Sequence, residues 1–204
     1  MNPIPFVLAS ALFSVALAPG MPASCTGCSF AHQDLHGANL SGGSYIGADF
    51  AGSNLREANL QRATLTGVDF RNADLGGANL RGAALIGVDL DGASLETTNF
   101  DGATLVGADA RGAKGRGLSM EGADAEGVTF AGADLRGANM RAAKLCTRGE
   151  RISCVDLRSA DVRGADMRGA LICANGREAR GCQAVDAATL RAYAKSTLDG
   201  AILQ

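Results

Sequence analysis

A five-residue period runs through most of this chain and restricts its fold more than any other feature. Every fifth residue from Phe30 to Leu145 is apolar except Gly115, and we call these residues the centres. The residue two places before a centre is most often Ala, and the residue two places after it is most often Gly. This unit fits neither the 3.6-residue period of an amphipathic helix nor the 2-residue period of a strand. Repetition of this kind predicts a solenoid, whose units bury their apolar side chains against one another.

A second period of twenty residues is superimposed on the first. The residue before the centre is Asp at 49, 69, 89 and 109, and it is Asn at 39, 59, 79, 99 and 139. The centres at 30, 50, 70 and 130 are Phe. Four units should therefore form one coil, which places residue n beside residue n+20 at a spacing of about 4.8 Å. We expect stacked aromatic rings in the core and Asn side chains that hydrogen bond to one another along a column.

Stretches such as LHGANL, REANL, GGANL and RGADM resemble the pentapeptide-repeat family, whose pattern is A-[DN]-L-x-x. The resemblance covers roughly residues 30–174. It implies an all-β solenoid, a right-handed quadrilateral parallel β-helix in which the central Leu or Phe and the preceding Ala point inward. It does not by itself imply a function, because one fold serves many functions.

The register changes after Leu145, where the next centre is Leu157. We interpret this step of twelve residues as two units plus two extra residues. The expected organisation is a signal peptide over 1–23, a β-helix over 24–174 with an inserted loop at 146–154, and a C-terminal loop and capping helix over 175–204. The helix is expected at 186–197, where Ala, Leu, Arg and Lys favour helical backbone.

The N-terminus has the composition of an export signal. Residues 4–18 contain no charge, and small residues follow in PGMPAS. This length suits a signal-peptide core and is short for a membrane span, so we expect cleavage near Ala23, a periplasmic or secreted protein, and no transmembrane span in the mature chain. A buried helix is an alternative, as is a lipoprotein acylated on Cys25, although Pro22 stands where an aliphatic residue is expected.

Six cysteines in an exported chain suggest disulfide bonds. Their spacing favours Cys146–Cys154 and Cys173–Cys182, which leaves Cys25 and Cys28. That remaining pair, together with His32 and His36, also forms a candidate zinc or copper site. The alternative is structural, because Cys25 and Cys28 fall on inward positions of the repeat and can form a local disulfide.

Two surfaces are candidates for binding. The first is an uncharged face that we call the flat face; it contains Ile46, Thr64, Thr66, Ile86, Thr104 and Val106, with Ser44 and Ala84 between them. Contiguous exposed apolar residues often mark contact sites, although a plain β surface is the alternative. The second is a basic patch made of Arg148, Arg151, Arg158, Arg163 and Arg168.

These features favour a non-enzymatic exported scaffold that binds a protein, with a homodimer as one possibility. No catalytic constellation and no cofactor are expected, because the two imidazoles lie at one end and the carboxylates recur in regular columns. The net charge of −2 argues against nucleic acid as a partner. Two other functions remain open: a DNA mimic that protects a topoisomerase, as the family resemblance allows, and a metal-binding protein using the Cys and His cluster.

Overall fold

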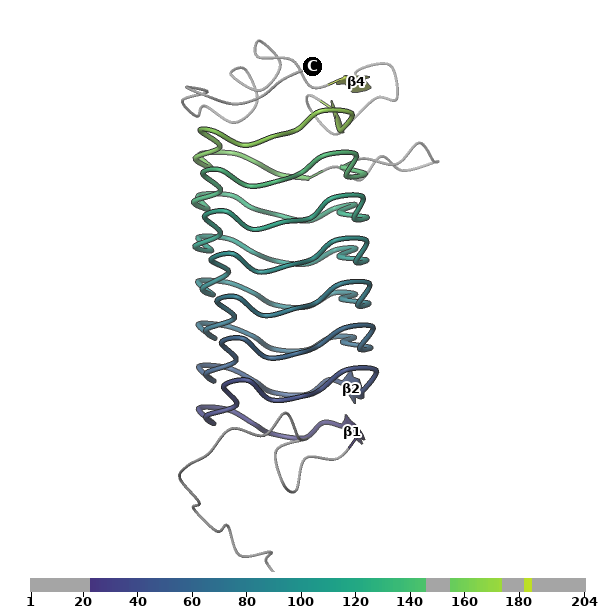
Figure 1. The fold of residues 1–204 in the computed structure, drawn as a ribbon, viewed down its shortest axis with the longest axis vertical. Helices are drawn as coiled ribbons and strands as arrows, with labels where there is room; N and C mark the ends of the chain where they lie inside the picture. The colour runs from purple at the N-terminus through teal and green to yellow at the C-terminus, as the bar shows by residue number, and fades with distance from the viewer. Residues whose placement is uncertain (1–22, 146–154, 174–181, 185–204) are drawn as a thin grey trace, which may run out of the picture.

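The computed structural model describes residues 23–145, 155–173 and 182–184. These residues form coils stacked along one axis, with β1 (Ser24–Thr26) at one end and β4 (Cys182–Ala184) at the other (Figure 1). Between them lie β2 (Ser44–Ile46) and β3 (Leu171–Cys173). The chain therefore builds a rod whose long sides are the surfaces available for binding.

Parallel pairing at a step of twenty residues holds the rod together. β1 pairs with β2 in the register Ser24 to Ser44, and single parallel bridges continue this column through Thr64, Ala84 and Thr104. Three further columns of bridges begin at residues 29, 34 and 39. Four bridge columns per twenty residues give the rod four sides, so the prediction of an all-β solenoid with four units per coil is confirmed.

The backbone hydrogen bonds repeat in each coil. The Leu65 N–H donates to the Ala84 carbonyl at 2.7 Å, and the Thr64 N–H donates to the Gly43 carbonyl at 2.8 Å. At each corner a tight turn follows, as where the Ala63 N–H donates to the Leu60 carbonyl at 3.1 Å. The second corner residue has a left-handed backbone, as at Gly67 with φ 62°, which explains the periodic glycine because glycine adopts positive φ without a steric penalty.

The core consists of the centres and the small residues two places before them. Leu60, Leu65 and Leu75 are fully buried, as is Ala58. The rings of Phe30 and Phe50 stack with centroids 4.8 Å apart, and those of Phe50 and Phe70 with centroids 5.3 Å apart, which confirms the expected aromatic column.

The coil with small centres at 110, 115 and 125 is filled from neighbouring positions. Leu118 and Met120 are fully buried there. A Cβ added to Gly115 would clash with the Leu118 side chain and would lie 3.0 Å from Leu135 Cδ2. Leu118 stands where the repeat usually has Ala, so one enlarged position compensates for one reduced centre.

The expected Asn ladder is wrong. The side-chain oxygen of each column Asn accepts the backbone N–H two residues later, as from Asn79 to Arg81 at 3.1 Å and from Asn99 to Asp101 at 2.8 Å. Asp side chains do the same, as Asp49 does for the Ala51 N–H at 2.9 Å. The residue before the centre is therefore Asp or Asn because its side chain caps the corner turn.

The insertion after Leu145 also differs from the sequence interpretation. Asp156 bridges to Thr129, a step of 27 residues instead of twenty, and the Val155 N–H donates to the Leu145 carbonyl at 2.8 Å. The change of register is thus one ordinary unit whose two-residue corner is extended by seven residues, and not two units plus two residues. The loop 146–154 itself lies outside the described residues.

At the C-terminal end, a strand falls where only a loop and helix were expected. β4 pairs antiparallel with β3 in the register Leu171 to Ala184, so the chain folds back on its last strand. The proposed helix at 186–197 lies outside the described residues. Within the described part of the chain, no helix is long and apolar enough to cross a membrane.

Candidate interaction surfaces

The structure brings all residues of the flat face onto one side of the rod. Ser44, Thr64, Ala84 and Thr104 form its bridge column. Each is followed two residues later by a member of the second column, which is Ile46, Thr66, Ile86 and Val106. The sequence prediction that these residues share one surface is therefore correct in geometry.

Ile46 and Ile86 stand out from every other large apolar residue of the described chain. Their side chains are 44% and 46% exposed, and no other large hydrophobic residue among those described is exposed. The flat face ends at the next coil, where Asp124 continues its bridge column. There Lys144 Nζ and Asp124 Oδ2 form an ion pair at 2.9 Å. The apolar residues thus form a bounded patch and do not run the length of the rod.

The adjoining side carries the column of aspartates that suggested DNA mimicry. Arg71 pairs with Asp69 and lies 3.7 Å from Asp89, and Arg111 pairs with Asp109 at 2.6 Å. The Arg71 side chain holds the pKa of Asp69 below its usual value, mainly through their hydrogen bond. Because arginines pair with Asp69 and Asp109, two of the four aspartates of this column, its charge pattern differs from the unbroken negative charge of a phosphate backbone.

The predicted basic patch is not a single surface. Asp156, Asp161 and Asp166 bridge to three different columns, so Arg158, Arg163 and Arg168 lie on three successive sides of the rod. Each arginine pairs with the aspartate two residues before it, at 2.6 Å. These hydrogen bonds lower the pKa of Asp156, Asp161 and Asp166. Residues five apart lie on successive sides of the rod. The sequence analysis did not use this rule when it grouped these arginines into one patch. Arg148 and Arg151 lie outside the described residues.

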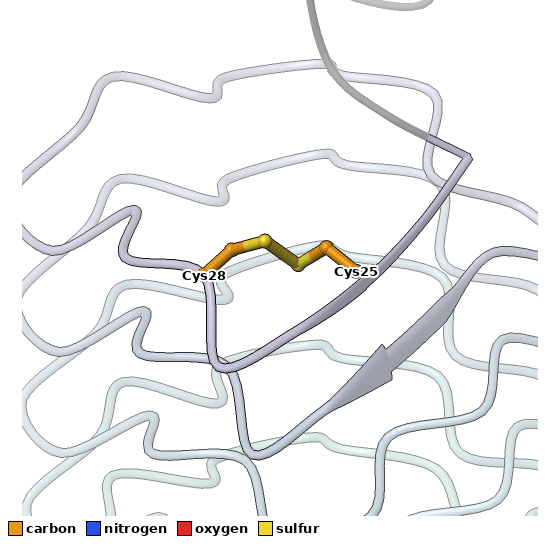
Figure 2. The surroundings of a disulfide bond; sticks show 2 residues. All are labelled: Cys25 and Cys28. Carbon is orange, nitrogen blue, oxygen red and sulfur yellow. A yellow bond between two sulfur atoms is a disulfide. The ribbon is translucent and has the colours of Figure 1, made fainter. Parts of the chain in front are cut away.

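The N-terminal Cys and His cluster is organised around a disulfide. Cys25 and Cys28 are joined across a Cα separation of 5.9 Å (Figure 2). His32 occupies a left-handed corner with φ 56°, and its ring covers Gly52. Zinc binds thiolate sulfur, whereas both sulfurs here are bonded to each other. No group of three or more potential metal ligands occurs in the described part of the chain.

Two of the four cysteines in the C-terminal part of the chain, Cys173 and Cys182, lie within the described residues. Cys173 and Cys182 are directly opposite in the antiparallel register of β3 and β4. Opposed residues of antiparallel strands have Cα atoms about 4.5–5.5 Å apart, a separation that a disulfide can span. The register therefore supports the predicted Cys173–Cys182 bond. Cys146 and Cys154 lie outside the described residues.

Sequence reasoning missed one feature, a groove at the corner that leads into the flat face. Gln61, Arg62, Arg81, Gly82, Asp101 and Gly102 line it, and its volume is about 300 Å³. The sequence alone does not single it out. Arg81 follows Asn79 and has no local aspartate, but Arg141 follows Asn139 in the same way and still pairs with Asp166 at 3.8 Å.

Comparison with known proteins gives one family. The family model of pentapeptide repeats matches residues 46–82, 78–114 and 116–146, with 8 copies of the repeat. No curated protein matches the chain significantly.

Several solved structures are similar. HetL, a pentapeptide repeat protein involved in heterocyst differentiation regulation in the cyanobacterium Nostoc, is 28% identical over 89% of this chain and 83% of its own, with a TM-score of 0.48. A pentapeptide repeat protein of the Arabidopsis thaliana thylakoid lumen is 29% identical over 43% of this chain and 66% of its own, with a TM-score of 0.37. QnrB1, a plasmid-mediated fluoroquinolone resistance protein, is 23% identical in a trypsin-treated variant over 89% of this chain and 82% of its own, with a TM-score of 0.36.

Proposed function

Because the chain belongs to the pentapeptide-repeat family, whose members form right-handed quadrilateral β-helices, we propose that it is a non-enzymatic exported scaffold that binds another protein through the flat face. One observation carries this proposal. Among the described residues, the two exposed large apolar side chains, Ile46 and Ile86, lie on the same uncharged side of the rod. They are separated by Thr66 in the same column. Exposed apolar groups that gather on one uncharged face rimmed by polar residues are typical of protein contact sites.

The side chains elsewhere on the rod support a binding role rather than catalysis. The column aspartates cap corner turns and pair with arginines, as Asp69 does with Arg71, so their carboxylates serve the fold. The chain has two imidazoles, His32 and His36, and both belong to the first coil. A nucleophile with a base and an orienting group in reach is the usual requirement of covalent catalysis.

Export is supported by two independent features. The uncharged segment 4–18 has the composition of a signal peptide, although it lies outside the described residues. The Cys25–Cys28 disulfide of the first coil is a bond that persists in oxidising compartments such as the periplasm. We therefore propose that the rod acts in the periplasm or outside the cell.

Site-specific photocrosslinking in native cells tests the docking surface. A photoreactive residue at position 86 should give a discrete crosslinked product, which mass spectrometry would identify as another protein or a second copy. The same residue at position 91 is the matched control, because Asp91 occupies the equivalent exposed position on the adjoining side. Crosslinking from position 91 and not from position 86 would contradict the proposal.

A further inference from the structure

The flat face is too small to form a stable protein interface alone. The four coils that form it are spaced by about 4.8 Å along the rod. Each coil contributes three residues, and each residue extends about 3.3 Å across the face. This area is roughly 200 Å², whereas a stable interface buries about 800 Å² on each partner. A partner of the flat face must therefore also contact the corners beside it, and the chemistry of those corners indicates what it carries.

The corner that leads into the flat face contains the groove between Arg62 and Arg81. Thr64 follows Arg62 by two residues, and Ala84 follows Gly82 by two, so the groove borders the flat face directly. The Arg62 side chain extends along the groove, because its Cγ would be 3.8 Å from a Cβ added to Gly82. A volume of about 300 Å³ is at the lower limit for small-molecule sites, which suits a single side chain of a partner.

Arg62 and Arg81 differ from most cations of the rod. Nine described Lys and Arg side chains form ion pairs with carboxylates. Within the described ranges, Arg62 and Arg81 form none. Asp101 lines the same groove, but its Oδ1 accepts the Ser119 hydroxyl and, at 3.0 Å, the Glu121 N–H of the next coil. The groove therefore holds two guanidinium groups against one carboxylate, and no ion pair joins either arginine to it. The excess of positive charge favours an external anion.

Arg62 occupies the left-handed corner position, with φ 56°, that glycine occupies in most coils. Other residues with side chains share this corner conformation, Thr97 and Ala142 among them, so the conformation places Arg62 at the corner and does not by itself mark it for a function.

We propose that the groove between Arg62 and Arg81 receives an acidic side chain of the protein that docks on the flat face, a proposal that rests on the proposed function. Arginine is suited to this role because its planar guanidinium binds carboxylates with paired hydrogen bonds. The partner surface then combines apolar side chains, opposite Ile46 and Ile86, with a carboxylate at one edge.

The test uses a capped tetraglutamate peptide as probe, with nuclear magnetic resonance of the arginine Nε–H groups of the full chain as readout. Titration should shift the Arg62 and Arg81 signals and leave Arg116 unchanged, because Arg116 lines a separate groove whose other guanidinium, that of Arg136, already pairs with Asp134. Shifts of equal size at Arg116 would overturn the proposal, since they would show attraction to any exposed cation. Inorganic phosphate is titrated separately, and saturable binding of phosphate without binding of the peptide would also overturn it.

A variant that gives Arg81 a carboxylate partner within the chain provides a second test. Asn79→Asp should pair with Arg81, as Asp69 does with Arg71, and weaken peptide binding by about tenfold. Asn39→Asp is the matched control, because it makes the same change in the same column two coils away and should leave binding nearly unchanged. Equal binding by Asn79→Asp and the wild type would contradict the assignment of the groove.

The Ile86→Lys variant separates this proposal from the proposed function. It should leave peptide binding in the groove intact, because Ile86 does not line the groove. If Ile86→Lys leaves protein crosslinking unchanged while the groove still binds the peptide, the proposed docking face fails and the groove remains a carboxylate site. If docking depends on Ile86 but the groove does not bind the peptide, the groove assignment alone fails.

Discussion

The ring of Tyr45 occupies the space that a side chain on Gly43 would need. A Cβ added to Gly43 would lie 2.5 Å from Tyr45 Cε2 and 2.9 Å from its hydroxyl oxygen. Gly43 stands at the inward position that is usually Ala, and its backbone is not left-handed. Glycine is therefore required here by packing against a neighbouring ring and not by backbone conformation.

Gly43→Ala should destabilise the protein by about 1–3 kcal/mol, because an extra methyl group in a packed core forces the neighbouring ring to move. The same substitution in a Tyr45→Leu background should cost less than about 1 kcal/mol, since Leu is the usual centre and leaves room for Ala. Urea unfolding of the four proteins of this double-mutant cycle measures the coupling. Additive effects would show that the two residues do not compete for space.

The ion pairs of the last described coils predict a dependence on pH. The pKa values of Asp156, Asp161 and Asp166 are lowered by hydrogen bonds to Arg158, Arg163 and Arg168. Groups with lowered pKa contribute stability above their unfolded pKa of about 3.9, and this contribution is lost as the pH falls through the lower folded pKa. The melting temperature should therefore fall as the pH is reduced below about 4.

The triple substitution of Asp156, Asp161 and Asp166 by Asn isolates this effect. Asn still caps the corner N–H, as Asn79 does for Arg81, but it carries no charge. The variant should be slightly less stable at neutral pH and should show a weaker dependence of melting temperature on pH below about 4. An unchanged pH profile would mean that these ion pairs do not contribute to stability.

Much of the fold could be predicted because the repeat periods determine which residues face inward and which lie beside one another. The identity of the inward residues follows from the five-residue period, and the side of the rod that Ile46 and Ile86 share follows from the twenty-residue period. It was harder to predict where a small residue makes room for a large neighbour. Gly43 and Gly115 are glycines for this reason, whereas the corner glycines are required by a left-handed backbone. Only three-dimensional neighbours, Tyr45 for one and Leu118 for the other, distinguish them.

The errors concern places where two interpretations fit the same residues. A column of Asn can form a ladder between coils or cap the corner within each coil, and the backbone N–H two residues later proved the closer partner, as at Asn79. The insertion before Val155 could be divided into repeats in more than one way, and only the bridge between Thr129 and Asp156 fixes the register. The lack of ion pairs at Arg62 and Arg81 among the described residues could not be predicted, because it depends on where every other cation of the rod pairs.

The register of β3 and β4 predicts a second disulfide. Cys173 and Cys182 are opposed, so proteolysis of native protein without reductant should release a linked peptide that contains both. This bond closes a loop of about nine residues, which is worth roughly 2.5 kcal/mol in the chain-entropy model. Alkylation of both as free thiols in protein taken from its native compartment would contradict the prediction.

Export predicts a shortened N-terminus. Mass spectrometry of the native protein should find a first residue close to Ala23, which leaves β1 and the Cys25–Cys28 disulfide in the mature chain. Mature protein that retains Met1 would contradict the export proposal, and a lipid attached to Cys25 would replace it with membrane anchoring.

Substitution of Ile86 tests the docking function most directly. Ile86→Lys places a charge at the middle of the flat face, and Glu96→Lys places a lysine at the equivalent exposed position on the opposite side of the rod. Each protein is measured for association, by crosslinking to its partner or by light scattering for a second copy, and for melting temperature. We predict that Ile86→Lys abolishes association while both variants melt within a few degrees of the wild type, as expected of surface changes. Association that survives Ile86→Lys, or that is lost equally with Glu96→Lys, would contradict the flat face as the binding surface.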